Sequence, residues 1–426
     1  MSKLKAILIG AGNRGTAYTN IMHQGIGDFE VVAVAEPIEE KRNFIAEKHS
    51  IPTDMCFTSW EPMLEKEKFA DVALVCTLDR DHFAPAMAAI EKGYNLLLEK
   101  PIAPTPEECM AIKNAAIKKG VKILVCHVLR YTTLFGKLKE LIDSGLVGDI
   151  VSIEHDECVG NVHQSHSFVR GNWGNSDKSS PMLLQKSCHD MDILQWMIGK
   201  KCTKIHSFGS LTYFTRKNAP ADAPDYCIDG CPHADTCYYN AVKLYYNDKN
   251  NSWFRTVATG NPSPTDEDVE KALHTTQFGK CVFKCDNNVV DHQVVNMDFE
   301  DGVLANFNMC AFNKACRHTR IMGTKGELSA NADSKVIDFF DFATREVIEI
   351  DTQAKTSGST LVSGHGGGDS GIIISLGEYL RDECSAEGLS EISISADNHM
   401  IVFAAEHSRH TGTVVNVADF TASYDK

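Results

Sequence analysis

The sequence feature that most constrains the fold is a glycine pattern near the start of the chain, GAGNRG at residues 10–15. It follows an apolar run at residues 4–9 that is typical of a buried strand, and a helical pattern follows it. Gly10 suits a tight turn, Gly12 a close approach of the backbone to a pyrophosphate, and Gly15 close packing of helix on strand. The helix N-terminus then offers unpaired N–H groups to phosphate. The pattern predicts a strand–turn–helix unit that binds a dinucleotide.

The next strand pattern supports this prediction because it ends on an acid. Glu36 closes the run EVVAVAE, 21 residues after Gly15, where a carboxylate would bind the adenosine ribose hydroxyls. A carboxylate there also repels a 2′-phosphate, so we expect NAD rather than NADP, although Arg14, Lys41 and Arg42 leave NADP open. The candidate cofactor-binding residues are Gly10, Gly12, Asn13, Arg14, Gly15, Glu36, Glu99 and Lys100.

Strand and helix patterns then alternate along the chain. Apolar strand patterns at residues 71–78, 94–101 and 121–131 are separated by helical patterns, and near-continuous apolar strands are typical of a sheet covered on both faces. This alternation predicts an α/β fold with a doubly wound parallel sheet, a Rossmann domain over residues 1–127. Ligands of such sheets bind beyond the carboxyl ends of the strands.

One of these strand ends carries a charged corner. The run LLLEKP places Glu99, Lys100 and Pro101 directly after three leucines. Proline fixes its own φ and restricts the preceding residue to extended geometry, so the Lys100 ammonium projects from a held backbone. A cation beside a nicotinamide would hold a substrate hydroxyl and favour its alkoxide as hydride leaves. We therefore predict a catalytic role for Lys100, with a solvated strand-end lysine as the alternative.

A helical pattern at residues 181–199, PMLLQKSCHDMDILQWMIG, carries a second set of titratable groups. Lys186, His189 and Asp190 are expected to project together, about one turn apart. The ordinary pKa of histidine, about 6.5, suits proton exchange with a hydroxyl near neutral pH. Lys186 is a second cation in the site, the catalytic base, or the partner of Asp190 in a helix salt bridge.

Together these motifs resemble the Gfo/Idh/MocA family of nicotinamide-dependent sugar oxidoreductases, which includes inositol dehydrogenases and glucose–fructose oxidoreductases. The resemblance rests on residues 10–15, Glu36, the Glu-Lys-Pro corner and HDMDILQW, and it extends to IMGTKGEL at 321–328. It implies that His189 contacts the substrate and serves as acid/base. The family often has an acid four residues before this histidine, where this chain has Gln185.

The resemblance also implies a second domain, residues 128–426, which is α/β with an open, mostly antiparallel sheet. Because this sheet often mediates oligomer contacts in the family, we expect a homo-oligomer, either a dimer or a tetramer. Residues 155–175 are rich in aromatic and multi-donor side chains that suit the ring face and hydroxyls of a sugar. The candidate substrate residues are His163, His166, Arg170, Trp173 and Asp190. His292 and His365, the latter in a glycine-rich stretch at 357–371, are weaker candidates.

Cysteine usage singles out one further segment. Most of the 15 cysteines lie singly in apolar strands, as small buried side chains do in a reducing compartment. The exception is an insertion at about 216–240, DYCIDGCPHADTCYYNA at its centre, which has little apolar content. Tetrahedral zinc takes four thiolate or imidazole ligands, so we predict a structural zinc, with free thiols or a disulfide as the alternative. The candidate ligands are Cys227, Cys231, Cys237 and one of Cys281 or Cys285.

Charge and hydropathy exclude several function classes. The formal net charge of −15 repels phosphate backbones, so neither nucleic acid nor an anionic membrane is an expected partner. No apolar run approaches the ~18 residues of a membrane helix, and the first residues lead directly into a strand without a secretory segment, so we expect a cytoplasmic protein. We predict an NAD-dependent oxidoreductase that acts on a secondary hydroxyl of a sugar, polyol or glycoside. Two alternatives stay open, a redox-neutral NAD-dependent glycosidase and a non-catalytic regulator that binds NAD and sugar.

Overall fold

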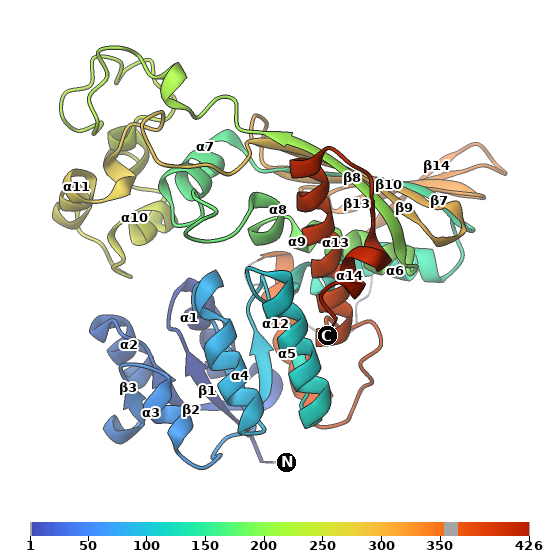
Figure 1. Ribbon diagram of the computed structural model, residues 1–426, viewed down its shortest axis with the longest axis horizontal. Coiled ribbons are helices and arrows are strands. Elements are labelled where there is room, and N and C mark those ends of the chain that lie inside the picture. Colours follow the sequence, from blue (N-terminus) through green and yellow to red (C-terminus); the bar gives the residue numbers. More distant parts are fainter. Residues whose placement is uncertain (1, 353–364, 426) are drawn as a thin grey trace.

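The structure is a computed structural model that describes residues 2–352 and 365–425 (Figure 1). Its N-terminal layer is a six-stranded parallel sheet in the order β3-β2-β1-β4-β5-β6. This is the strand order of dinucleotide-binding sheets. Strands β2 and β3 are added on one side of β1, and strands β4, β5 and β6 are added on its other side. The predicted doubly wound parallel sheet is confirmed. Its strands are β1 (Leu4–Ile9), β2 (Phe29–Ala35), β3 (Cys56–Phe57), β4 (Val72–Val75), β5 (Asn95–Leu98) and β6 (Ile123–Val125).

Helices from two parts of the chain pack around this sheet. Those that connect its strands are α1 (Asn13–His23), α2 (Glu39–His49), α3 (Glu61–Glu65), α4 (Phe83–Glu91) and α5 (Pro106–Lys119). A further helix, α12 (Gly368–Leu380), returns from the C-terminal part of the chain and contacts α1. Its Ile372 and Leu376 are buried in one apolar cluster with Leu8 and Tyr18. A distant segment therefore completes the Rossmann layer.

The second layer is a nine-stranded sheet in the order β14-β13-β12-β11-β7-β10-β9-β8-β15. The β7/β10 pair is parallel, and the other pairs among the described strands are antiparallel. The implied mostly antiparallel sheet is confirmed. Its strands are β7 (Ile150–Cys158), β8 (Cys202–Ser210), β9 (His292–Phe299), β10 (Leu304–Cys310), β11 (Cys316–Gly323), β12 (Gly326–Asn331), β13 (Val336–Asp341), β14 (Val347–Asp351) and β15 (Val415–Asn416).

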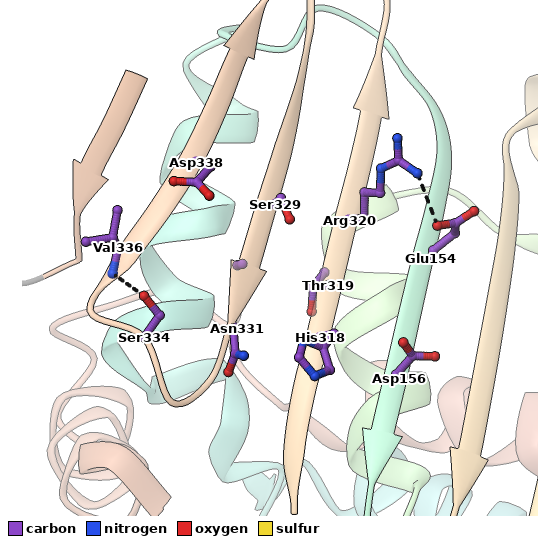
Figure 2. Close-up of a pocket in the computed structure, with 11 residues that line it drawn as sticks. Glu154, Asp156, His318, Thr319, Arg320, Ser329, Asn331, Ser334, Val336 and Asp338 are labelled. Carbon is purple, nitrogen blue, oxygen red and sulfur yellow. Dashed lines mark hydrogen bonds and ion pairs between the residues drawn. The ribbon is translucent and has the colours of Figure 1, made fainter. Parts of the chain in front are cut away.

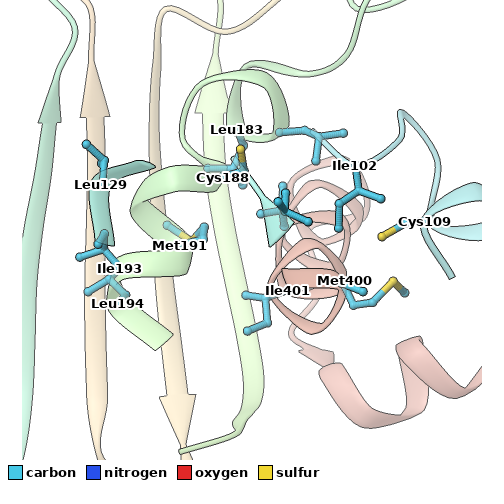
Figure 3. Close-up of a cluster of buried hydrophobic side chains, with 14 of the residues drawn as sticks. Ile102, Cys109, Leu129, Leu183, Cys188, Met191, Ile193, Leu194, Met400 and Ile401 are labelled. Atoms are coloured by element: carbon cyan, nitrogen blue, oxygen red, sulfur yellow. The ribbon is translucent and has the colours of Figure 1, made fainter. Parts of the chain in front are cut away.

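A shared apolar core joins the two layers. Figure 3 shows Cys188 and Met191 of α9 (Cys188–Ile198) near Met400 and Ile401 of α13 (Ile392–Thr411), with Ile102 and Cys109 of the Rossmann domain on the other side. This packing holds α9 in place beneath the second sheet. The helices of this part are α6 (Thr133–Asp143), α7 (Asn161–Ser165), α8 (Met182–Gln185), α9 (Cys188–Ile198), α10 (Ser252–Thr259), α11 (Asp266–Thr275), α13 (Ile392–Thr411) and α14 (Val417–Ala422). Among the described residues, no helix is long and apolar enough to cross a membrane.

The two faces of the second sheet differ in exposure. Along β7, His155 and Glu157 are buried, whereas Glu154 is exposed and Asp156 is only partly buried, as expected from strand alternation. The outer face carries a shallow hollow of about 280 Å³ with charged side chains from β7, β11 and β13 (Figure 2). The oligomer contacts implied for this sheet stay a prediction.

The cysteine-rich insertion belongs to a larger segment between β8 and β9 that has apolar clusters of its own. One cluster contains Tyr245, Phe254 and Leu273, and another contains Phe214 and Phe283. The insertion was expected to bury too little apolar surface to order itself. Instead its neighbours supply that surface, because Cys227 of the insertion belongs to the first cluster and Tyr239 of the insertion to the second.

Candidate active site

The glycine turn adopts the geometry that its sequence predicts. Gly10 has a positive φ of 92°, and a Cβ there would lie 2.6 Å from the Cys76 carbonyl oxygen. A Cβ on Gly15 would lie 2.2 Å from the Gly10 oxygen, whereas one on Gly12 would meet nothing within 4 Å. No side chain caps the start of α1, so its first N–H groups are available to a ligand. The turn fits the pyrophosphate of a dinucleotide.

Glu36 lies beside this turn at the end of β2. Its carboxylate accepts hydrogen bonds from the Ala11 N–H at 2.7 Å and the Ile38 N–H at 3.0 Å. The Arg14 side chain makes other contacts, because its guanidinium bonds Glu99 at 3.0 Å and Asp369 at 2.6 Å. Arg14 therefore ties α1 to the end of β5 and to α12.

The Lys100 corner connects the two domains. The Lys100–Pro101 peptide bond is cis, and the Lys100 N–H donates to the Glu99 carboxylate at 3.0 Å. The Lys100 ammonium donates to the backbone oxygen of Gln185 at 2.6 Å. Gln185 ends α8, where the last carbonyl groups of a helix lack intrahelical partners. The Rossmann domain thus places its lysine against the end of a helix from the second domain.

The pattern at 181–199 forms two helices instead of the single helix that we predicted. Helix α8 ends at Gln185 and α9 begins at Cys188, with Ser187 between them at a non-helical ψ of 4°. The break frees the Gln185 carbonyl for Lys100 and places Lys186 outside either helix. His189 lies in the first turn of α9.

Both domains line one cavity of about 440 Å³, which is within the usual size range for small-molecule sites. Eight of the predicted site residues line it: Asn13, Arg14, Glu99, Lys100, His163, Trp173, Lys186 and His189. The cavity therefore joins the glycine turn, the Lys100 corner and the start of α9. Trp173 donates its indole N–H to Asp79 at 3.3 Å, and the His163 ring lies 5.4 Å from that of Trp253.

Three predicted substrate residues are buried away from this cavity. His166 stacks on Phe254 at 4.0 Å and bonds the Tyr245 hydroxyl at 2.9 Å. Arg170 donates to the backbone oxygens of Lys280 at 2.8 Å and Tyr239 at 2.7 Å. Both side chains hold the segment between β8 and β9 in place. The structure does not support direct substrate contact by them.

Asp190 is the third of these residues, and it is fully buried. It accepts hydrogen bonds from Arg317 Nε at 2.7 Å and bonds His155 Nε2 at 3.0 Å. The expected projection of Asp190 together with Lys186 and His189 is therefore not found. One turn of α9 sends His189 to the cavity and Asp190 into the protein behind it.

Comparison with known proteins identifies the family. The oxidoreductase family with an NAD-binding Rossmann fold matches residues 4–127, and its C-terminal alpha/beta domain matches residues 139–357. The chain belongs to the Gfo/Idh/MocA oxidoreductase family. The Bacillus subtilis (strain 168) protein YteT, named as an oxidoreductase, is 23% identical over 324 residues, which are 70% of each chain. Inositol 2-dehydrogenase 4 of Saccharopolyspora erythraea is 25% identical over 205 residues, 48% of this chain and 56% of that enzyme.

Solved structures share the fold of this family member. An oxidoreductase domain protein from Kribbella flavida has a TM-score of 0.71 at 17% identity, over 98% of this chain and 100% of that one. An oxidoreductase from Agrobacterium radiobacter, in complex with NAD+, L-tartaric acid and magnesium, has a TM-score of 0.69 at 11% identity, over 98% and 99%. The chain spans about half the length of the inositol 2-dehydrogenase relatives.

A charge network forms the cavity wall at the end that Lys186 and Arg317 line. Arg317 bonds Asp190 and also Glu157, and the Lys186 ammonium lies 3.2 Å from Glu157. Lys186 thus pairs with Glu157 and not with Asp190, the partner that a helix salt bridge would have used. Burial lowers the pKa of Lys186 despite the opposing charge of Glu157. Burial would raise the pKa of Asp190, but Arg317 and His155 together outweigh it and the pKa lies well below its ordinary value.

Sequence patterns did not reveal several residues that line the cavity. Arg317 comes from β11 and Trp253 from α10. Both lie far along the chain from the catalytic motifs, and only the strand pairing of β11 with β7 brings Arg317 to Glu157. Asp79 was recognisable as a residue at a strand end, and it accepts a hydrogen bond from the Ser180 hydroxyl at 2.7 Å.

Two buried histidines lie behind His189. The His127 ring is 5.7 Å from that of His189 and 5.4 Å from that of His399. Burial lowers the pKa of His127 to about 4, against the opposing charge of Asp192. Burial likewise lowers the pKa of His399 to about 3. Both rings are therefore neutral near pH 7.

The cysteine cluster does not form the predicted zinc site. Cys227, Cys231, Cys237 and Cys281 line a common hollow of about 270 Å³, and all four are free thiols. Within residues 2–352 and 365–425, no group of three or more His, Cys, Asp or Glu side chains is arranged to hold a metal ion. The cysteines approach one another because Arg170 and the two apolar clusters gather their loops.

The remaining candidates do not join the cavity. The Cys285 thiol contacts the Cys281 backbone oxygen at 3.5 Å. His292 pairs with Asp291 at 2.8 Å and is absent from the cavity lining. Most of the glycine-rich stretch at 357–371 lies outside the described residues, as does the His365 side chain.

Proposed function

We propose that this protein is an NAD-dependent dehydrogenase that acts on a secondary hydroxyl of a sugar or polyol. The observation that carries the proposal is the convergence of Lys100 and His189 on one cavity, next to Asn13 and Arg14 of the glycine turn. A cation, a titratable imidazole and a dinucleotide-binding turn are groups suited to alcohol oxidation by a nicotinamide.

The residues divide the reaction between them. NAD would supply the hydride acceptor at its nicotinamide ring. The Lys100 ammonium, held by the Gln185 carbonyl, donates a hydrogen bond to the substrate oxygen and favours the alkoxide. His189 accepts the hydroxyl proton and passes it to solvent. The carbon gives up its hydrogen as hydride, so a secondary alcohol becomes a ketone with release of one proton.

Two further observations support the finer assignments. Glu36 is nearly buried beside the glycine turn, where its carboxylate disfavours a 2′-phosphate and favours NAD over NADP. The family relatives named inositol 2-dehydrogenase support a polyol as the substrate class.

A direct assay tests the proposal. Purified protein and NAD are mixed with a panel of sugars, polyols, sugar acids and aryl glycosides, and both reduced-nicotinamide absorbance and aglycone release are recorded. We expect reduced nicotinamide to accumulate with at least one member of the panel. Aglycone release without net reduction would contradict the dehydrogenase and identify the redox-neutral glycosidase. NAD binding without either signal would favour the regulator.

A further inference from the structure

The substrate end of the cavity is lined by an excess of cations. Lys100, Lys186 and Arg317 line it, and the described carboxylates that also line it are Asp79 and Glu99. Both carboxylates are already bonded. Asp79 accepts from Ser180 and Trp173, whereas Glu99 accepts from Arg14 and Tyr18 at the cofactor side.

The carboxylates that balance Lys186 and Arg317 lie behind the cavity wall. Glu157 and Asp190 are 3% and 0% exposed and do not line the cavity. The side chains of Lys186 and Arg317 remain 18% and 16% exposed. The cations therefore stand between the cavity and their partners, which gives the cavity face a positive potential where water is restricted.

Gln185 does not offset this asymmetry. Gln185 adds no negative charge to the cavity lining, because its side-chain amide donates to the Trp173 backbone oxygen and its backbone carbonyl accepts from the Lys100 ammonium. Glu157 and Asp190 balance Lys186 and Arg317 from behind the wall, so both cations are held in place with one side facing the cavity. A neutral polyol needs one cation at its reacting hydroxyl and offers nothing to the other two.

We propose that the substrate carries a carboxylate in addition to the hydroxyl, as uronic and aldonic acids do. Arg317 and Lys186 bind the carboxylate, while Lys100 and His189 hold the hydroxyl. Trp173 and Trp253, which line the same cavity, flank the carbon skeleton. Assignment of the hydroxyl end rests on the proposed function, whereas binding of the carboxylate does not.

Calorimetric titration of the NAD-loaded protein tests this specificity. The probes are matched pairs: glucuronate with glucose, galacturonate with galactose, and gluconate with glucitol, plus glucose 6-phosphate. Because a hydrogen bond to a charged group contributes substantially to binding, we expect at least one acid to bind about tenfold or more tightly than its neutral partner. Equal or tighter binding of the neutral partner in every pair would overturn the proposal, and so would tightest binding of the sugar phosphate.

Three variants locate the carboxylate subsite. Arg317→Gln and Lys186→Gln should each remove most of the preference for the acid. Because both are measured, the test still works if one of them misfolds. Arg320→Gln is the matched control, because Arg320 lies on the same strand but bonds Glu327 on the outer face and should leave the preference unchanged. A preference that survives both cavity variants would contradict the assignment.

The binding readout separates this inference from the proposed function. Tight binding of an acid, with no member of the panel reducing NAD, supports the carboxylate subsite and contradicts the dehydrogenase. If a neutral polyol reduces NAD and no acid binds preferentially, the dehydrogenase is supported and the carboxylate subsite is contradicted.

Discussion

Two aspartates that follow His189 on α9 belong to networks with different consequences. Asp192 bonds Arg130 through both carboxylate oxygens at 2.6 Å, and the two side chains are 1% and 2% exposed. Asp190 bonds Arg317, which reaches the cavity. The two carboxylates lie two residues apart on one helix, yet one is enclosed by protein and the other supports the wall of the site.

The surroundings explain the difference. Arg130 also donates to the Leu389 backbone oxygen at 3.2 Å, and Asn398 of α13 donates to Asp192, so this network joins α9 to the segment that follows β6 and to α13. The Arg317 network joins α9 to β7 and β11 beside the cavity. We infer that a buried ion pair stabilises the domain arrangement when protein encloses it and shapes ligand binding when a cavity opens on it.

The largest expected effect concerns the enclosed network. Asp192→Ala leaves Arg130 buried without its carboxylate, which should lower the free energy of unfolding by about 3–5 kcal/mol. Urea denaturation followed by circular dichroism measures it. Asp190→Ala is the matched control and should cost less, because Arg317 keeps Glu157 and access to water. Equal losses in the two variants would contradict the distinction.

The next effect concerns turnover. Lys100→Met keeps the length of the side chain but removes the charge at the reacting oxygen, so the turnover number should fall about 10²–10³-fold. Reduced-nicotinamide absorbance measures this, and calorimetry should show NAD affinity within about a factor of three of the parent. Unchanged turnover would remove Lys100 from the chemistry.

Two glycines of the glycine turn should differ in the same way, because one affects cofactor binding and the other affects the stability of the fold. Gly12→Ala adds a Cβ that meets no protein atom within 4 Å but faces the expected pyrophosphate, so NAD affinity should fall about tenfold, a loss of ~1.4 kcal/mol, with stability unchanged. Gly10→Ala places a Cβ 2.6 Å from the Cys76 oxygen at a positive φ and should destabilise the fold instead. Thermal unfolding and NAD titration of both variants distinguish the two roles.

The smallest effect is a pH dependence behind His189. Burial lowers the pKa of His127 to about 4, from about 6.5 in the unfolded chain. Between these values the unfolded chain binds a proton that the native protein does not, so the free energy of unfolding decreases as pH falls from about 6.5 to 4. His127→Phe should reduce this slope by up to ~1.4 kcal/mol per pH unit. The exposed His318→Gln variant should leave the slope unchanged, and an unaltered slope in His127→Phe would contradict a neutral buried ring.

The parts of the site that could be predicted are those encoded over short distances. Gly10, Gly15 and Glu36 follow from one strand–turn–helix–strand unit, and local sterics dictate their geometry. The family resemblance supplied His189. Arg317 was missed because only strand pairing brings β11 beside β7, and no local sequence pattern indicates that pairing. The zinc prediction failed for a related reason, since composition alone did not reveal the apolar clusters and Arg170 contacts that order the insertion.

A crystal structure of the protein with NAD tests the central claim most directly, because it locates the nicotinamide ring relative to Lys100 and His189. The account predicts that nicotinamide C4 faces both side chains across a gap that admits one carbinol carbon, with reacting atoms about 3–3.5 Å apart. The adenosine ribose should lie against Glu36. A nicotinamide ring turned to solvent, or separated from Lys100 by the cavity wall, would contradict it.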